Sequence, residues 1–146
     1  MKLILQEKRE KELTILVEYP QLDAQVKRIV HAIRAEEDSV MGEEGGRSYC
    51  IPIADIFYAE CIDKRTFIYT QSHVYRVSKS LSQLEENLRK YSFARVSKRC
   101  LLNVNVLEGL KTLPNSKLEA NLVNGEKIII SRTYIPEIKK VIFAEV

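Results

Sequence analysis

The dipeptide Asn124-Gly125 is the strongest short hairpin signal in this chain. It separates residues 117–123 from residues 126–131, two runs long enough to form strands that return alongside one another. Apolar residues alternate along the first run and share one face: Leu118, Ala120 and Leu122. The hairpin is therefore expected to bury one face and leave the other mostly polar.

Comparable apolar runs, each bounded by turn residues, fill most of the chain after residue 46. They predict strands at residues 49–53, 56–62, 66–71, 74–77, 94–96, 101–106 and 110–113. A helix is expected from Ser80, which can cap it, to Lys90, with one apolar face made by Leu81, Leu84 and Leu88. A last helix should begin near Ile135-Pro136 and bury Ile138, Val141 and Ile142. The predicted class is an α+β domain dominated by antiparallel strands, over residues 47–146.

Residues 1–46 have a different composition and are expected to form a separate arm. Residues 12–19 suit a strand that stops at Pro20. A helix should follow, capped by Asp23 or the preceding turn, with an apolar face made by Leu22, Val26, Ile29, Val30 and Ile33. Residues 35–46 are acidic and glycine-rich, as in a flexible linker. One strand and one helix cannot enclose a core, so the arm packs either on its own domain or on a second copy.

Charge divides along the same boundary. Residues 1–46 hold seven Lys and Arg against ten Asp and Glu, whereas residues 47–146 hold sixteen against ten. The C-terminal part therefore has a net charge of +6, as expected for a domain that binds a polyanion. The alternative explanation is that this modest net charge serves only to keep the domain soluble.

Three polar or basic tips interrupt the predicted strands and are the candidate binding residues. They are Lys64-Arg65-Thr66, Ser97-Lys98-Arg99, and Ser131-Arg132-Thr133 with Tyr134. Arginine and lysine can contact phosphates or guanine edges, and hydroxyl groups can donate to phosphates. The alternative is that each tip is a solvated turn. Sequence alone does not show whether the tips converge.

The residues offer little for catalysis. Two histidines, three scattered cysteines and the lack of a phosphate loop or nucleophile motif argue against an enzyme, a small-molecule substrate and any cofactor. No cysteine or histidine spacing suggests a metal site. Cys50, Cys61 and Cys100 are expected to be buried hydrophobes, with redox sensing at Cys100 as an alternative. The absence of a signal peptide predicts a cytoplasmic protein.

The order of segments after Arg47 resembles the LytTR family of bacterial DNA-binding domains. The resemblance is carried by Ile56-Phe57-Tyr58-Ala59-Glu60, a basic loop, a helix, the run from Phe93 to Asn103, and Ser131-Arg132-Thr133-Tyr134 before a terminal helix. It implies a transcriptional regulator that inserts its loops into successive major grooves of double-stranded DNA at a repeat-containing promoter site. The alternative, from a different class of function, is a non-catalytic protein-interaction module whose basic loops bind an acidic protein or RNA.

The resemblance also assigns roles to residues. Lys98 and Arg132 or Thr133 become candidates for base contacts, and Thr66 matches the first contact loop, with Lys64 and Arg65 beside it. Ser97, Arg99, Ser131 and Tyr134 are expected to hold phosphates or support the loops, and Asn103 is expected to be structural. Serine at position 97, arginine at position 99 and threonine at position 133 depart from the commoner family pattern, so the preferred DNA sequence is expected to differ.

Only 46 residues precede the resemblance, too few for the receiver domain that the family often carries. We therefore expect a stand-alone regulator. Binding to direct repeats suits two copies of the chain, so the predicted partners are duplex DNA and a second copy, joined through the N-terminal helix. A membrane protein that restrains the regulator is a further hypothesis from the resemblance.

Overall fold

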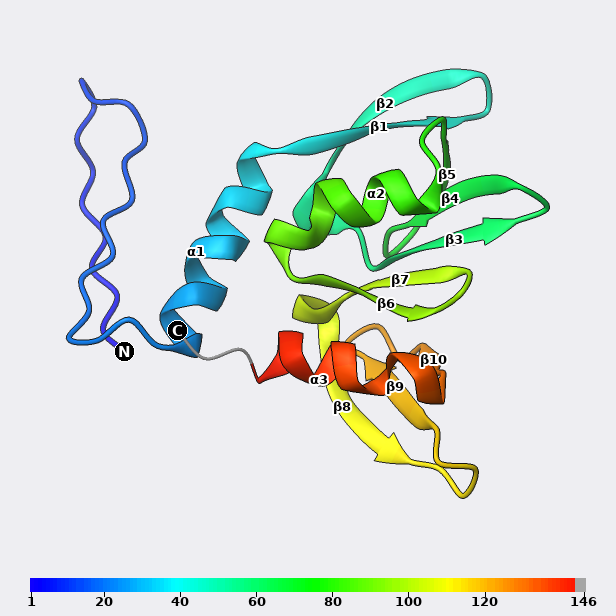
Figure 1. Cartoon of the computed structure of the whole chain (residues 1–146). Coiled ribbons are helices and arrows are strands. Elements are labelled where there is room, and N and C mark those ends of the chain that lie inside the picture. The colour runs from blue at the N-terminus through cyan, green and yellow to red at the C-terminus, as the bar shows by residue number, and fades with distance from the viewer. Residues whose placement is uncertain (144–146) are drawn as a thin grey trace.

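Two antiparallel sheets and three helices make up the computed structural model, which describes residues 1–143 of the 146-residue chain (Figure 1). The larger sheet has seven strands in the order β2-β1-β5-β4-β3-β7-β6, and the smaller has three in the order β10-β9-β8. The strands of the larger sheet are β1 Ser39–Glu44, β2 Arg47–Pro52, β3 Tyr58–Ile62, β4 Arg65–Tyr69, β5 Val74–Val77, β6 Phe93–Ser97 and β7 Cys100–Asn103. The smaller sheet contains β8 Leu107–Thr112, β9 Leu118–Leu122 and β10 Lys127–Ile130. The α+β class and the predominance of antiparallel strands are confirmed.

The helices are α1 Ala24–Glu37, α2 Leu81–Leu88 and α3 Ile135–Ile142. Four single-turn 3₁₀ helices lie in the connections between elements: η1 Ile53–Asp55, η2 Arg89–Tyr91, η3 Val104–Val106 and η4 Arg132–Tyr134. The predicted cap of α2 is confirmed, because the Ser80 hydroxyl accepts a hydrogen bond from the Gln83 N–H at 3.2 Å. The Gln83 side chain in turn accepts from the Ser80 N–H at 2.9 Å, which completes a capping box. This pair of bonds starts the helix at a defined residue.

Alternation along β7 places two neighbouring side chains in two different cores. Leu101 belongs to the core between the seven-stranded sheet and α2, where the predicted apolar face of that helix, Leu81, Leu84 and Leu88, is buried. Leu102 points to the opposite side and packs with the hairpin residues Leu118, Ala120 and Leu122 and with Ile138 of α3. The sheet is therefore covered by α2 on one side and, in part, by the smaller sheet and α3 on the other (Figure 1).

Two predictions for the N-terminal part are wrong. Residues 12–19 form no strand, although they are apolar and β-branched, because no neighbouring strand in the chain pairs with their backbone. Residues 39–44, expected within a flexible linker, form β1, which pairs with β2 from Ser39↔Pro52 to Glu44↔Arg47. Gly45 and Gly46 both have positive φ, which allows the tight turn of this hairpin.

The predicted helix after Asp23 is confirmed as α1, and the Asp23 carboxylate accepts from the Val26 N–H at 2.9 Å. Its far end contacts the sheet domain, since the Tyr91 hydroxyl donates to the Asp38 carboxylate. His31 Nδ1 also lies 3.0 Å from the Ser92 hydroxyl. These contacts hold one side of α1 against its own chain.

The cysteines are less buried than expected. Cys61 and Cys100 are half-buried and pack against the two cores, whereas Cys50 is exposed on the edge strand β2. Burial, with a smaller contribution from the Glu60 carboxylate, raises the pKa of the Cys100 thiol to about 12, although nearby Arg95 acts in the opposite direction. A raised pKa disfavours the thiolate that a redox sensor needs.

Asn103 has the structural role expected of it. It is buried, its Nδ2 donates to the Ile56 carbonyl at 2.8 Å, and its Oδ1 accepts from the Asn105 N–H at 3.0 Å. It therefore ties the end of β7 to the segment before β3.

Replacing Asn103 with alanine should lower the free energy of unfolding by about 1–3 kcal/mol, because a buried donor and acceptor lose their partner. Urea denaturation followed by circular dichroism measures the change. The control is Asn87→Ala on the exposed side of α2, which should stay within about 0.5 kcal/mol of the wild type. Equal stability of the two variants would contradict the structural role of Asn103.

The thiols should differ in reactivity. At pH 8 iodoacetamide should modify exposed Cys50 first, while Cys100 should react slowly, because its pKa near 12 leaves almost no thiolate. Mass spectrometry of peptides at successive times measures both rates, with the urea-unfolded chain as the reference. Rapid modification of Cys100 in the folded protein would restore the redox alternative.

Candidate nucleic-acid interface

The first and second tips lie side by side because β3 and β7 are neighbours in the sheet. Their antiparallel pairing brings the end of β3 to the beginning of β7, with Glu60 opposite Cys100. The contact extends into the turn, where the Cys61 N–H donates to the Arg99 carbonyl at 2.9 Å. The β3–β4 and β6–β7 turns therefore project from the same end of the sheet (Figure 1).

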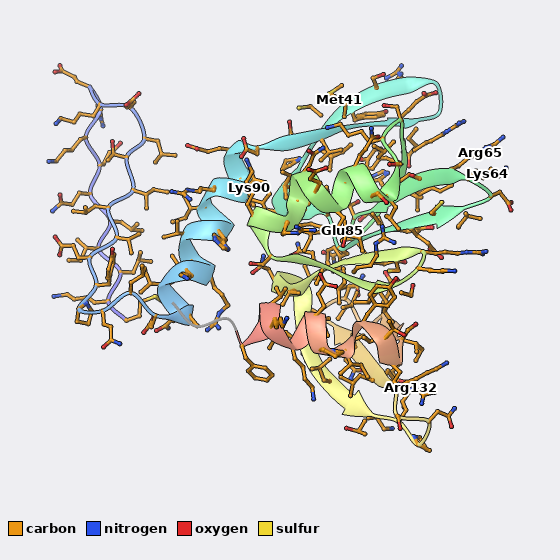
Figure 2. All side chains as sticks on the ribbon, in the orientation of Figure 1. Met41, Lys64, Arg65, Glu85, Lys90 and Arg132 are labelled. Carbon is orange, nitrogen blue, oxygen red and sulfur yellow. The ribbon has the colours of Figure 1, made fainter. Side chains whose placement is uncertain are left out.

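The third tip is joined to the second by a backbone hydrogen bond. After β10 the Ser131 N–H donates to the Val96 carbonyl at 2.8 Å, one residue before the second tip begins. Figure 2 shows Lys64, Arg65 and Arg132 along the same side of the molecule. The structure thus brings together three segments that lie more than 30 residues apart in sequence.

The candidate residues differ in exposure. Six of them are exposed: Lys64, Arg65, Lys98, Arg99, Arg132 and Thr133. Ser97, Ser131 and Tyr134 are half-buried, and Tyr134 packs against the core that contains Ile138. Only the first group can reach a partner freely.

Thr66 does not fit the contact role that the resemblance implied. It is only 4% exposed and lies within β4, paired with Cys61 and Val77 of the neighbouring strands. Side chains alternate along a strand, so Arg65 points outward and Thr66 points inward, like Ile68. Its hydroxyl is therefore unavailable to a ligand, and its role is structural.

Five of the exposed residues in the tips are cations. In residues 1–143 none of Lys64, Arg65, Lys98, Arg99 and Arg132 belongs to an ion pair. Lys64 also has a positive φ of 65°, as does its neighbour Asp63 at 50°, so the chain turns sharply and carries this tip outward. The tips therefore present cationic side chains that no carboxylate pairs with in this range, which suits an anionic partner.

Arg95, which is not among the residues predicted to form the interface, supports the second tip. Its Nη1 donates to the Lys98 carbonyl at 2.8 Å, and its Nη2 lies 3.3 Å from the Glu85 carboxylate of α2. The sequence does contain a sign of this role. Arg95 is a charged residue between Ala94 and Val96 in an otherwise apolar strand, and a charged side chain in such a position needs a partner. Within the same tip the Ser97 hydroxyl accepts from the Arg99 N–H at 3.3 Å.

A hydrogen bond from a stacked tyrosine connects the hairpin before the third tip to the larger sheet. The rings of Tyr58 and Tyr69 stack with centroids 4.3 Å apart, and the Tyr58 hydroxyl donates to the Glu126 carboxylate at 2.8 Å. Burial and this hydrogen bond raise the pKa of Tyr58, and burial raises the pKa of Tyr69 to about 12. Both phenols therefore stay neutral at physiological pH, and the Tyr58 hydrogen bond is maintained.

No group of three histidine, cysteine, aspartate or glutamate side chains in residues 1–143 is placed to hold a metal ion. No helix in the same range is long and apolar enough to cross a membrane.

Comparison with known proteins agrees with the fold. The chain resembles the sensory transduction proteins LytT of Enterococcus faecalis, at 25% identity over 107 residues, and of Bacillus subtilis, at 28% over 116 residues. These alignments cover 73% and 75% of this chain but 43% and 48% of the relatives, so the chain spans less than half of their length. An uncharacterized HTH-type transcriptional regulator of Staphylococcus aureus is 26% identical over 133 residues, with 90% of each chain covered.

A solved structure shares the fold. It is the LytTr DNA-binding domain of a Bacillus cereus protein described as a methyl-accepting/DNA response regulator, with a TM-score of 0.68 and 24% identity over 72% of this chain and 96% of the other. Residues 46–143 match the family model of the LytTr DNA-binding domain, which spans both sheets from β2 onward, the three tips and α3. The chain therefore belongs to the LytTR family of DNA-binding domains.

Proposed function

We propose that this protein is a sequence-specific, DNA-binding transcriptional regulator acting in the bacterial cytoplasm, and that its three tips enter successive major grooves. The observation that carries the proposal is that backbone contacts bring together three exposed cationic tips, whose side chains form no ion pair in residues 1–143. Family membership supports the same function, and so does the name of the Staphylococcus aureus relative, which describes a transcriptional regulator.

The geometry suggests a division of roles among the tips. Following the family resemblance, Lys98 and Arg132 are the proposed base readers, with Thr133 beside Arg132, and all three residues are exposed as this role requires. Lys64, Arg65 and Arg99 are proposed to contact phosphates. Ser97, Ser131 and Tyr134, being half-buried, are proposed to hold the loops in place.

We also propose that the regulator works as a homodimer through its N-terminal segment. Nine large apolar side chains are exposed in this segment: Met1, Leu3, Ile4, Leu5, Leu13, Ile15, Leu16, Tyr19 and Leu22. The segment extends away from both sheets (Figure 1). An apolar surface of this kind is normally covered by a partner. Basic and acidic residues are nearly balanced in it, so a second copy can approach without net repulsion.

Lys98→Ala and Arg132→Ala should each weaken binding to a preferred duplex by about 1–3 kcal/mol and reduce discrimination against a scrambled duplex, because a base contact is lost. Lys64→Ala should weaken both duplexes equally, since a phosphate contact carries no sequence information. Fluorescence anisotropy measures the affinities, using a duplex that the wild type selects from a random pool.

Lys90→Ala is the matched control. It also removes one positive charge, but Lys90 lies away from the tips (Figure 2), and the variant should bind like the wild type. The wild-type affinity should also fall with salt with a log–log slope of roughly −5 if about six phosphates are neutralised. If the protein binds both duplexes equally, and salt abolishes this binding, sequence-specific regulation is contradicted. An acidic protein or RNA would then be favoured as the partner.

Leu13→Asp combined with Leu16→Asp should convert a dimer into a folded monomer, because charge would be introduced into the apolar contact. Analytical ultracentrifugation over a range of concentrations measures the state, and circular dichroism checks the fold. Val123→Asp, an equivalent change at an exposed site outside the segment, should leave the dimer intact. A wild type that stays monomeric at every concentration would contradict self-association and favour a membrane-protein partner.

A further inference from the structure

Arg95 occupies an unusual position for a charged side chain. It lies in β6 between buried Ala94 and Val96, and its own side chain is only 13% exposed. Ala94 and Val96 face the core shared with the smaller sheet, so alternation directs Arg95 to the opposite side, where α2 covers the sheet. Arg95 therefore points toward the helix rather than toward solvent or DNA.

The guanidinium connects two separate elements. Nη1 donates to the Lys98 carbonyl at 2.8 Å, whereas Nη2 lies 3.3 Å from the Glu85 carboxylate and 3.4 Å from the Ser82 hydroxyl. One end of the planar group thus binds the second tip and the other end binds α2. A lysine cannot reproduce this arrangement, because its single ammonium group lacks the fork of donors.

The helix provides a fixed reference for this contact. Leu84 and Leu88, next to Glu85 on α2, are at most 1% exposed. The capping box at Ser80 and Gln83 fixes the beginning of the same helix. The Glu85 carboxylate is therefore attached to an element that cannot shift without disturbing the core.

The turn itself needs such support. The pairing of β6 with β7 shifts register between Arg95 and Ser97, so the regular ladder is interrupted just before the tip. Side-chain bonds add to the Ser97↔Cys100 pair that closes the turn: Arg95 holds the Lys98 carbonyl and Ser97 holds the Arg99 N–H. The position of Lys98 thus depends in part on a side chain that α2 orients.

Stability alone is a poor explanation of this arrangement. Arg95 Nε is buried and has no hydrogen-bond partner within residues 1–143, and an unpaired buried donor is costly. A largely buried ion pair is also weak evidence for a net gain in stability. This energetic cost is consistent with an arginine that is retained because it sets the geometry of the second tip.

We propose that Arg95 is a positioning residue for DNA recognition: Glu85 of α2 orients Arg95, and Arg95 fixes the backbone at Lys98, so that α2 sets how the second tip meets a base. This inference rests on the proposed function, because it assumes that Lys98 contacts DNA. Arg95 itself does not touch the DNA. Its effect on discrimination passes through Lys98.

Three variants of the full chain test the proposal. Arg95→Lys keeps the charge but loses the fork, Glu85→Gln removes the carboxylate charge, and the double exchange Glu85→Arg with Arg95→Glu restores an ion pair without a donor for the Lys98 carbonyl. Glu86→Gln, the neighbouring exposed position on α2, is the control. Thermal unfolding, amide hydrogen exchange at residues 97–99, and affinity for the selected and scrambled duplexes are measured for each.

Arg95→Lys and the double exchange should accelerate amide exchange in the tip and lower the preference for the selected duplex by about fivefold or more. The double exchange should nevertheless unfold near the wild-type temperature. Added to Lys98→Ala, Arg95→Lys should lower the preference little further, since both changes act on one contact. Glu85→Gln should give an intermediate loss and Glu86→Gln none.

Wild-type exchange rates and wild-type preference in a folded Arg95→Lys variant would overturn the positioning role. Full additivity with Lys98→Ala would also overturn it, because Arg95 would then act elsewhere. The exchange measurement needs no DNA and therefore separates the two proposals. A wild type without sequence preference refutes the proposed function, whereas unchanged exchange at residues 97–99 refutes the positioning of the tip.

Discussion

The pairing of β3 with β7 is the contact on which both the sheet and the proposed interface depend. It joins strands about 40 residues apart in sequence, so its formation requires closure of a long loop before any bond is gained. Backbone bonds extend it at both ends, from the Asn103 N–H to the Phe57 carbonyl and from the Cys61 N–H to the Arg99 carbonyl. Without it the two hairpins whose turns carry Lys64 and Lys98 would not be joined in one sheet.

The two cores give the tips different support. On one side of the sheet, α2 reaches the second tip through Glu85 and Arg95. On the other side, the smaller sheet and α3 hold the third tip, since Tyr134 packs into that core and Ser131 bonds to β6. The first tip relies on its own tight turn and on its neighbour. A change in either core is therefore expected to reach the surface at a different loop.

The N-terminal segment illustrates the limit of local propensity. Residues 12–19 have the composition of a strand, yet they remain irregular, because strand formation needs a partner for the backbone donors and acceptors. Residues 39–44, acidic and ending next to two glycines, form a strand because β2 supplies that partner. The availability of a neighbour outweighed composition in both places.

Sequence by itself determined the elements whose signals are local. The Asn124-Gly125 hairpin, the Ser80 cap, the apolar face of α2, the start of α1 at Asp23 and the basic character of the tips were all predictable, because turn chemistry, capping and periodicity act over a few residues. Only the tertiary structure decided which tips meet, that β1 belongs to the sheet, that Thr66 faces inward and that Arg95 supports Lys98. These features depend on strand register and on contacts between distant segments, and neither is encoded in the spacing of neighbouring residues.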